Sequence, residues 1–154
     1  MTISLRDAAF TDSARLLRWR NDPAIRRASF SAGAVGEAEH EAWLRARLAD
    51  PATLLLIAEE DGLAVGQVRL DRDGANGAGE VSIAVAPQAR GRGIGRTMLM
   101  ALAARDDLGV ATLRARVKAD NAASLALFAA AGYAEVRREA DGTVVLERAV
   151  VSAA

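Results

Sequence analysis

The sequence predicts one α/β domain, and three observations lead to this expectation. The chain has 154 residues, of which 51% are hydrophobic, so it is long enough to bury roughly two-thirds of its unfolded surface around one core. Strand patterns and helix patterns follow one another along most of the chain. Two Asp-Gly turns, at 61–62 and 141–142, join neighbouring strand patterns as hairpins.

The predicted elements follow from where apolar residues recur. Period-two alternation, or a short apolar run between turn signals, predicts strands at residues 3–6, 53–59, 63–71, 80–85, 112–118, 134–138 and 143–149. Apolar residues three or four apart predict helices at about residues 12–20, 37–49, 94–106 and 121–130. Pro23 is expected to stop the first helix, and the polar stretch 25–36 to be irregular. The alternation in 112–118 leaves one face of that strand basic.

The segment 80–100 organises the rest of the sequence. It begins as a strand with alternating apolar residues, turns after Pro87, and continues as an amphipathic helix from Ile94. The turn holds three glycines and three arginines, at Arg90, Gly91, Arg92, Gly93, Gly95 and Arg96. Glycine lets the backbone approach a ligand closely, and the unpaired first N–H groups of a helix lie at the positive end of its dipole. The turn is therefore predicted to bind phosphate.

Two better-known phosphate loops do not fit this turn. The dinucleotide pattern GxGxxG requires glycine where Arg96 stands, and the Walker A pattern requires glycine at Arg90 and lysine at Arg96. The pattern that fits is glutamine or arginine, two residues, glycine, one residue, then glycine or alanine, met by Arg90, Gly93 and Gly95. It resembles the coenzyme A pyrophosphate loop of the GNAT superfamily of acyl-CoA-dependent N-acetyltransferases. An ordinary glycine-rich turn with solvated arginines is the alternative.

A second pattern, in residues 117–133, resembles another signature of the same superfamily. It consists of Asn121, Ser124, Phe128, Gly132 and Tyr133, in register after a strand. The resemblance implies a mixed, mostly antiparallel sheet flanked by helices, whose strands splay beside the loop to admit the pantetheine arm of acetyl-CoA. It also divides the single domain 1–154 into an acceptor side, 1–52, and a cofactor-binding core, 53–150.

The resemblance implies that acetyl-CoA, the expected cofactor, contacts residues of both patterns. These are Ile83, Val85, Arg90, Gly91, Arg92, Gly93, Gly95, Arg96, Asn121, Ser124 and Phe128. The amide of Asn121 would hydrogen-bond the cofactor arm, and a simple helix cap is its alternative role.

Thioester aminolysis needs a base for the ammonium, donors for the oxyanion and a route for the departing thiolate. Glu80 is the predicted base, with a solvated glutamate as the alternative, and a backbone N–H near Val85 is the implied oxyanion donor. The superfamily's usual tyrosine is replaced by Phe128. Tyr133, the one tyrosine of the chain, is the remaining candidate acid, although it stands at a packing position of the superfamily. Otherwise the thiolate leaves unaided or through water.

The first fifty residues are similar to two subgroups of the superfamily, which acetylate nucleotide-linked amino sugars of the pseudaminic acid pathway and ribosomal protein N-termini. Arg26, Phe30, His40 and Arg69 are the predicted substrate contacts. Because arginine suits phosphate and aromatic faces stack on bases, an amino sugar or nucleotide-linked amino sugar is the expected acceptor. A peptide N-terminus and a non-catalytic acyl-CoA-binding module are the alternatives, and His40 is alternatively a core residue.

Composition argues against several other classes of protein. Twenty basic and 20 acidic residues give a formal net charge of zero, so no charge excess marks nucleic acid or an anionic membrane as a partner. The absence of cysteine excludes disulfides, thiolate metal sites and a cysteine nucleophile, and no metal is expected. Without a signal-peptide or membrane-spanning pattern, we expect a cytoplasmic monomer or homodimer that acts on a small-molecule amine.

Overall fold

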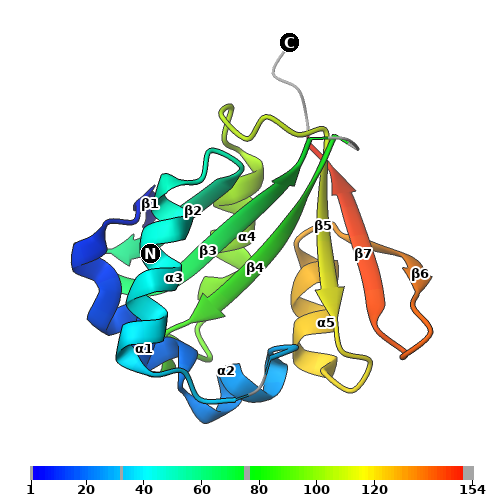
Figure 1. Ribbon diagram of the computed structural model, residues 1–154. Helices are drawn as coiled ribbons and strands as arrows, with labels where there is room; N and C mark the ends of the chain where they lie inside the picture. The colour runs from blue at the N-terminus through cyan, green and yellow to red at the C-terminus, as the bar shows by residue number, and fades with distance from the viewer. Residues whose placement is uncertain (1, 32, 75–76, 151–154) are drawn as a thin grey trace.

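A seven-stranded sheet with strand order β1-β2-β3-β4-β5-β7-β6 runs through the protein. The computed structural model in Figure 1 describes residues 2–31, 33–74 and 77–150. The strands are β1 (Ile3–Asp7), β2 (Thr53–Glu60), β3 (Leu63–Asp73), β4 (Ala78–Val85), β5 (Thr112–Val117), β6 (Ala134–Arg138) and β7 (Val144–Ala149). The helices are α1 (Ser13–Arg20), α2 (Pro23–Ala28), α3 (Glu37–Ala49), α4 (Ile94–Ala103) and α5 (Ala122–Ala130), with short 3-10 turns η1 (Phe10–Asp12) and η2 (Pro87–Ala89).

The predicted fold class is confirmed, because the sheet is mixed and mostly antiparallel. β4 and β5 are the one parallel pair among the described strands, and the neighbours on either side are antiparallel. β1 pairs with β2, so the acceptor side and the cofactor-binding core expected from the sequence share one sheet.

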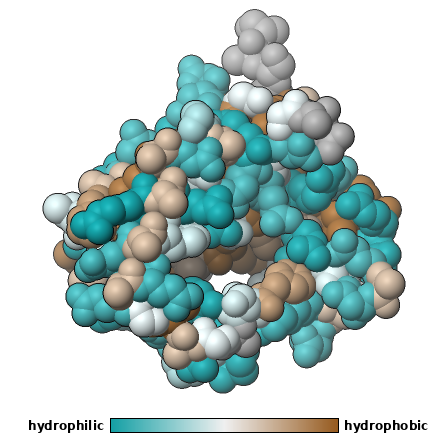
Figure 2. All heavy atoms as spheres, in the orientation of Figure 1, coloured by the Kyte–Doolittle hydropathy of each residue, from teal (hydrophilic) through white to brown (hydrophobic). Residues whose placement is uncertain are grey.

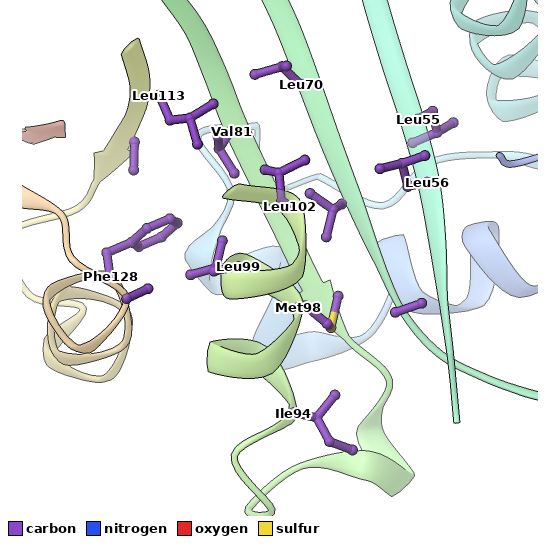
Figure 3. Packing of buried hydrophobic residues seen from close by; sticks show 14 of the residues in the cluster. Leu55, Leu56, Leu70, Val81, Ile94, Met98, Leu99, Leu102, Leu113 and Phe128 are labelled. Carbon is purple, nitrogen blue, oxygen red and sulfur yellow. The ribbon is translucent and has the colours of Figure 1, made fainter. Parts of the chain in front are cut away.

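The core lies between the sheet and the helices on its two faces. α4 packs against β1, β3 and β4, and α3 packs against β2. Figure 3 shows Leu102 of α4 beside Val81 and Leu70 of the sheet, with Met98 and Leu99 on either side of the same helix. These three α4 side chains have no exposed surface, and each such burial contributes roughly 1.5–3 kcal/mol. The apolar spacing of this helix therefore anchors the turn that precedes it.

β4 and β5 pair only where they begin. Their register runs from Ala78 opposite Thr112 to Glu80 opposite Arg114 and stops there. β4 continues to Val85 and β5 to Val117, and Figure 1 shows the two strands diverging toward the lower edge of the view. The strands thus open a V-shaped gap that ends beside the glycine–arginine turn.

Two predicted boundaries are corrected. Residues 23–28 form the helix α2 rather than irregular chain, because Asp22 caps it, with Oδ2 accepting from the N–H of Ala24 (3.1 Å) and Ile25 (3.2 Å). Pro23 is the first helical residue, where its missing N–H costs nothing, so it starts α2 as well as following α1. α4 ends at Ala103, about a turn earlier than its sequence pattern suggests.

A buried carboxylate ties the end of β1 to α1. Asp12 is 2% exposed and accepts hydrogen bonds from Arg6 (2.8 and 2.9 Å), Arg15 (3.1 Å) and the N–H of Ala9 (2.9 Å). The hydrogen bonds from Arg6, more than any other contact, hold the pKa of Asp12 below its ordinary value, against the opposing effect of burial.

We expect Asp12→Asn to lower the free energy of unfolding at pH 7 by about 2 kcal/mol, since hydrogen bonds to charged groups are lost. A carboxylate whose pKa is lower in the folded state stabilises that state fully when the pH is above the pKa of the unfolded chain, near 3.9. This stabilisation is lost as the pH falls through the folded pKa. Urea unfolding of both proteins at pH 7 and pH 3 checks this. A difference between them that is as large at pH 3 as at pH 7 would contradict it.

Candidate functional site

The glycine–arginine turn forms an open cradle at the start of α4. Gly91 and Gly93 have φ angles of +79° and +74°, and a Cβ at either position would meet no described atom within 4 Å. Thr97 donates to the carbonyl of Gly93 (3.2 Å), so the helical ladder begins there. The N–H groups of residues 94–96 precede this ladder, and the described residues offer them no backbone acceptor. This backbone can receive an anion.

Gly95 has a different role from the other two glycines. It is buried, and a Cβ there would lie 3.2 Å from a methyl of Leu127 and 3.5 Å from Val85. The residue therefore lets α4 approach α5 and β4 closely. The sequence pattern groups three glycines, whereas the structure assigns two to the open face of the loop and one to packing.

The three arginines of the turn are exposed, and two of them pair with distant carboxylates. Arg90 lies 2.7 Å from Asp22 and Arg92 lies 2.8 Å from Glu60. Within the described ranges Arg96 makes no ion pair. The turn thus keeps a positive surface, but part of its charge is already engaged by the protein.

The backbone of β4 faces the gap at alternate residues. The N–H of Ala86 donates to Val65 of β3 (2.8 Å), so in the antiparallel β3–β4 ladder the even-numbered residues of β4 direct their N–H and C=O toward β3. Those of Val81, Ile83 and Val85 consequently point to the side of β5, which has diverged. An extended ligand with amide groups can pair with this edge as an added strand does.

Glu80 stands at the narrow end of the gap with a half-buried side chain. Its neighbours in the sheet are Asp71 on β3 and Arg114 on β5. Asp71 is paired with Arg69 (2.8 Å), and Arg114 with Glu147 (2.8 Å). No ion pair engages Glu80 among the residues that the structure describes, so its carboxylate is available to a ligand.

The basic face of β5, which includes Arg114 and Arg116, lies beside Glu80 on the side away from β3. The pKa of Arg116 is raised, first by its hydrogen bond to Glu139 and to a smaller extent by the charge of Glu80. The alternation in the sequence reveals a basic face, but only the parallel pairing with β4 places it beside Glu80. Sequence reasoning therefore missed Arg116 as a candidate contact.

The second motif forms α5 and its ends. The Asn121 side chain accepts from the N–H of Ser124 (3.1 Å) and caps the helix. Phe128 and Tyr133 are 4% and 3% exposed, with ring centroids 5.0 Å apart in an edge-to-face contact. Burial raises the pKa of the Tyr133 hydroxyl, which has no hydrogen-bond partner among the described residues. This buried position is typical of a side chain that packs in the core. A role for Tyr133 as the acid stays a prediction.

The predicted acceptor residues occupy different environments. His40 is 3% exposed, its ring lies 5.6 Å from that of Trp43, and burial lowers its pKa. Arg69 lies over the Trp43 ring at 5.5 Å. Phe30 is 49% exposed, with the guanidinium of Arg116 at 4.8 Å from its ring centre. The structure thus places Phe30 at the surface and His40 in the interior.

Phe30 also borders a shallow groove of about 360 Å³ at the far end of β5. The groove is lined by Phe30, Lys118, Ala119, Asp120, Asp141 and Thr143. Figure 2, in the orientation of Figure 1, shows the surface hollowed between the two diverging halves of the sheet. Arg26 is half-buried and belongs to α2, which Figure 1 shows below the diverging strands.

Neither a metal cluster nor a membrane-spanning helix occurs within the described ranges. No group of three or more histidine, cysteine, aspartate or glutamate side chains there is arranged to hold a metal ion. No helix in the same ranges combines the length and the apolar character needed to cross a membrane.

Comparison with known proteins agrees with this geometry. The spermidine N-acetyltransferase of Vibrio cholerae, solved with CoA and spermine, superimposes with TM-score 0.86 at 18% identity, covering 96% of this chain and 95% of that chain. The yncA protein of Salmonella typhimurium, solved with its cofactor acetyl-CoA, gives TM-score 0.80 at 22% identity, with coverages of 100% and 97%. The ribosomal-protein-alanine N-acetyltransferase of Brucella melitensis gives 0.79 at 28%, with 95% and 99%.

Comparison with the curated protein sequences finds no match. The family model described as the acetyltransferase (GNAT) domain matches residues 2–134. That match takes in β1, the diverging strands, the cradle and α5. With the parallel β4–β5 pair that opens beside a glycine–arginine turn, it shows that the chain belongs to the GNAT acetyltransferase family.

Proposed function

We propose that the protein transfers the acetyl group of acetyl-CoA to the amino group of a small molecule. The observation that carries this proposal is the divergence of β4 from β5 directly beside the cradle of Gly91 and Gly93. The cradle and Arg96 suit the pyrophosphate, because unpaired N–H groups and a guanidinium are good phosphate donors. The exposed backbone edge of Ile83 and Val85 suits the amide groups of the pantetheine arm.

The chemistry then follows from the residues at the gap. The amine nitrogen attacks the thioester carbon, the C–S bond breaks, and coenzyme A leaves as the thiolate. Glu80 takes the proton that the ammonium must lose through a chain of waters, because Val85 lies about 16 Å farther along β4. The N–H of Val85 faces the gap and donates to the developing oxyanion. The thiolate takes a proton from solvent, or receives from Glu80 the proton that the ammonium lost, since Phe128 has none to give.

For the acceptor, we propose a phosphorylated or nucleotide-linked amino sugar. Phe30 presents an exposed ring on which a base or sugar can stack, and the Arg116 guanidinium beside it can bind phosphate. Arg26 adds a cation on α2. His40, being buried, is better suited to support Trp43 than to contact the acceptor.

A peptide N-terminus is the second candidate acceptor. It is favoured by the 28% identity to the ribosomal-protein-alanine N-acetyltransferase, and by the carboxylates Asp120 and Asp141 in the groove, which suit a cationic ligand. A thiol-release assay with acetyl-CoA against amino sugar phosphates, nucleotide-linked amino sugars and short peptides separates the two. Peptides that react faster than every amino sugar would overturn the first candidate. Tight acetyl-CoA binding without turnover on any amine would indicate a cofactor-binding module instead.

Replacing Arg26 tests the acceptor side alone. Arg26→Ala should raise the KM for a phosphorylated acceptor by about tenfold and leave acetyl-CoA affinity unchanged, because α2 lies outside the cofactor cradle. Steady-state kinetics and calorimetry check the two parts. Arg18→Ala, which removes a cation from α1, is the matched control. An equal rise in KM for both variants would show a general charge effect rather than a contact.

A further inference from the structure

The helix α2 lies across the open end of the gap between β4 and β5. Figure 1 shows it below the diverging strands, between α1 and α5. At its N-terminal end Asp22 pairs with Arg90 (2.7 Å), which follows β4 and η2. At its C-terminal end Lys118, directly after β5, donates to the carbonyl of Arg27 (2.8 Å). α2 therefore joins the free ends of the two strands.

Polar contacts hold this segment more than burial does. None of the six residues of α2 is buried, and Ile25 alone among them packs in part against the core. Two hydrogen bonds join the residues on either side of this segment. The Asn21 amide donates to the carbonyl of Val35 (2.9 Å) and accepts from its N–H (2.8 Å). Because few apolar contacts hold α2, the helix can shift when one of its polar contacts is lost.

The ion pair between Asp22 and Arg90 is the contact that a bound cofactor can break. Arg90 is the first residue of the cradle motif, and its side chain is 38% exposed. Asp22 Oδ2 binds Arg90 and also caps α2. A pyrophosphate offers Arg90 more negative charge than one carboxylate does, so it competes with Asp22 directly.

We propose that the Asp22–Arg90 ion pair is a latch, through which coenzyme A binding at the cradle releases α2 from the mouth of the gap. Asp22 is thus a positioning residue that acts through Arg90. In the cofactor-free protein α2 lies across the open end of the gap, opposite the narrow end where Glu80 stands. Loss of the ion pair loosens the contact of α2 with the strand ends, and the acceptor enters afterwards. This inference rests on the proposed use of the cradle by coenzyme A.

The chain offers two matched variants to test the latch. Asp22→Asn removes the charge that holds Arg90 but keeps a capping oxygen, because asparagine is as good a helix cap as aspartate. Glu60→Gln removes the equivalent partner of Arg92 and touches neither α2 nor its cap. Both changes remove a negative charge near the cradle, so both should tighten coenzyme A binding a few-fold.

The readout is amide hydrogen exchange at Arg26, Arg27, Ala28 and Ser29, measured by NMR with and without coenzyme A. In the wild type and in Glu60→Gln, coenzyme A should speed exchange at these amides by about fivefold or more. In Asp22→Asn, exchange should already be fast without the cofactor and change less than twofold on its addition.

Calorimetry on the same samples separates the possible failures. If coenzyme A binds the wild type but leaves α2 exchange unchanged or slower, the latch is overturned and the proposed function is not. Equal behaviour of Asp22→Asn and Glu60→Gln would also overturn it. If coenzyme A does not bind the wild type at all, the proposed function fails and the latch fails with it.

Discussion

Replacing Glu80 by glutamine is expected to lower the rate of acetyl transfer by roughly 10²–10⁴-fold while acetyl-CoA affinity is kept. Glutamine preserves the size of the side chain, so the half-buried position on β4 is not disturbed. It cannot accept the proton that the substrate ammonium must lose. Single-turnover transfer rates across a pH series, with calorimetry for cofactor binding, check both parts of the expectation.

Glu147→Gln provides the matched control for this substitution. Glu147 lies on the same face of the sheet, two strands away, but its carboxylate is engaged by Arg114 at 2.8 Å. We expect its replacement to change the transfer rate by less than about tenfold. A wild-type rate with a wild-type pH profile in Glu80→Gln would remove Glu80 as the base.

Replacing Gly93 by valine is expected to weaken acetyl-CoA binding by at least about tenfold. Gly93 precedes α4 with a φ of +74°, a conformation that costs a β-branched residue on the order of 1–3 kcal/mol. A Cβ there would meet no described protein atom, so the side chain would occupy the space in front of the helix. The cradle would then either change shape or be blocked, and calorimetry with acetyl-CoA measures the result.

Gly62→Val separates loss of the cradle from general strain. Gly62 has a φ of +82°, also with no neighbour within 4 Å, but it lies in the turn between β2 and β3. This variant should lose comparable stability and keep its acetyl-CoA affinity. Near-wild-type affinity in Gly93→Val would take the cradle out of the cofactor site.

Local residue patterns predict several elements of this protein correctly. The period-two pattern of β4, the amphipathic spacing of α4 and the glycines between them predict strand, turn and helix in the observed order. They do so because backbone dihedrals and apolar periodicity are set by neighbouring residues. Asp22 and Pro23 predict the start of α2 in an equally local way, as helix cap and first helical residue. The interpretation of Pro23 only as a helix stop overlooks this signal.

The contacts between these elements depend on residues that are far apart in the sequence. Arg90 pairs with Asp22 and Arg92 with Glu60, across 68 and 32 residues of chain, and no local pattern specifies such partners. The three glycines of one motif divide into two for the cradle and one for packing, because Leu127 of α5 lies against Gly95. The gap itself exists because β4 and β5 stop pairing after Glu80. Side-chain periodicity sets which face of a strand is buried, but strand order and the point of divergence depend on the packing of the whole sheet.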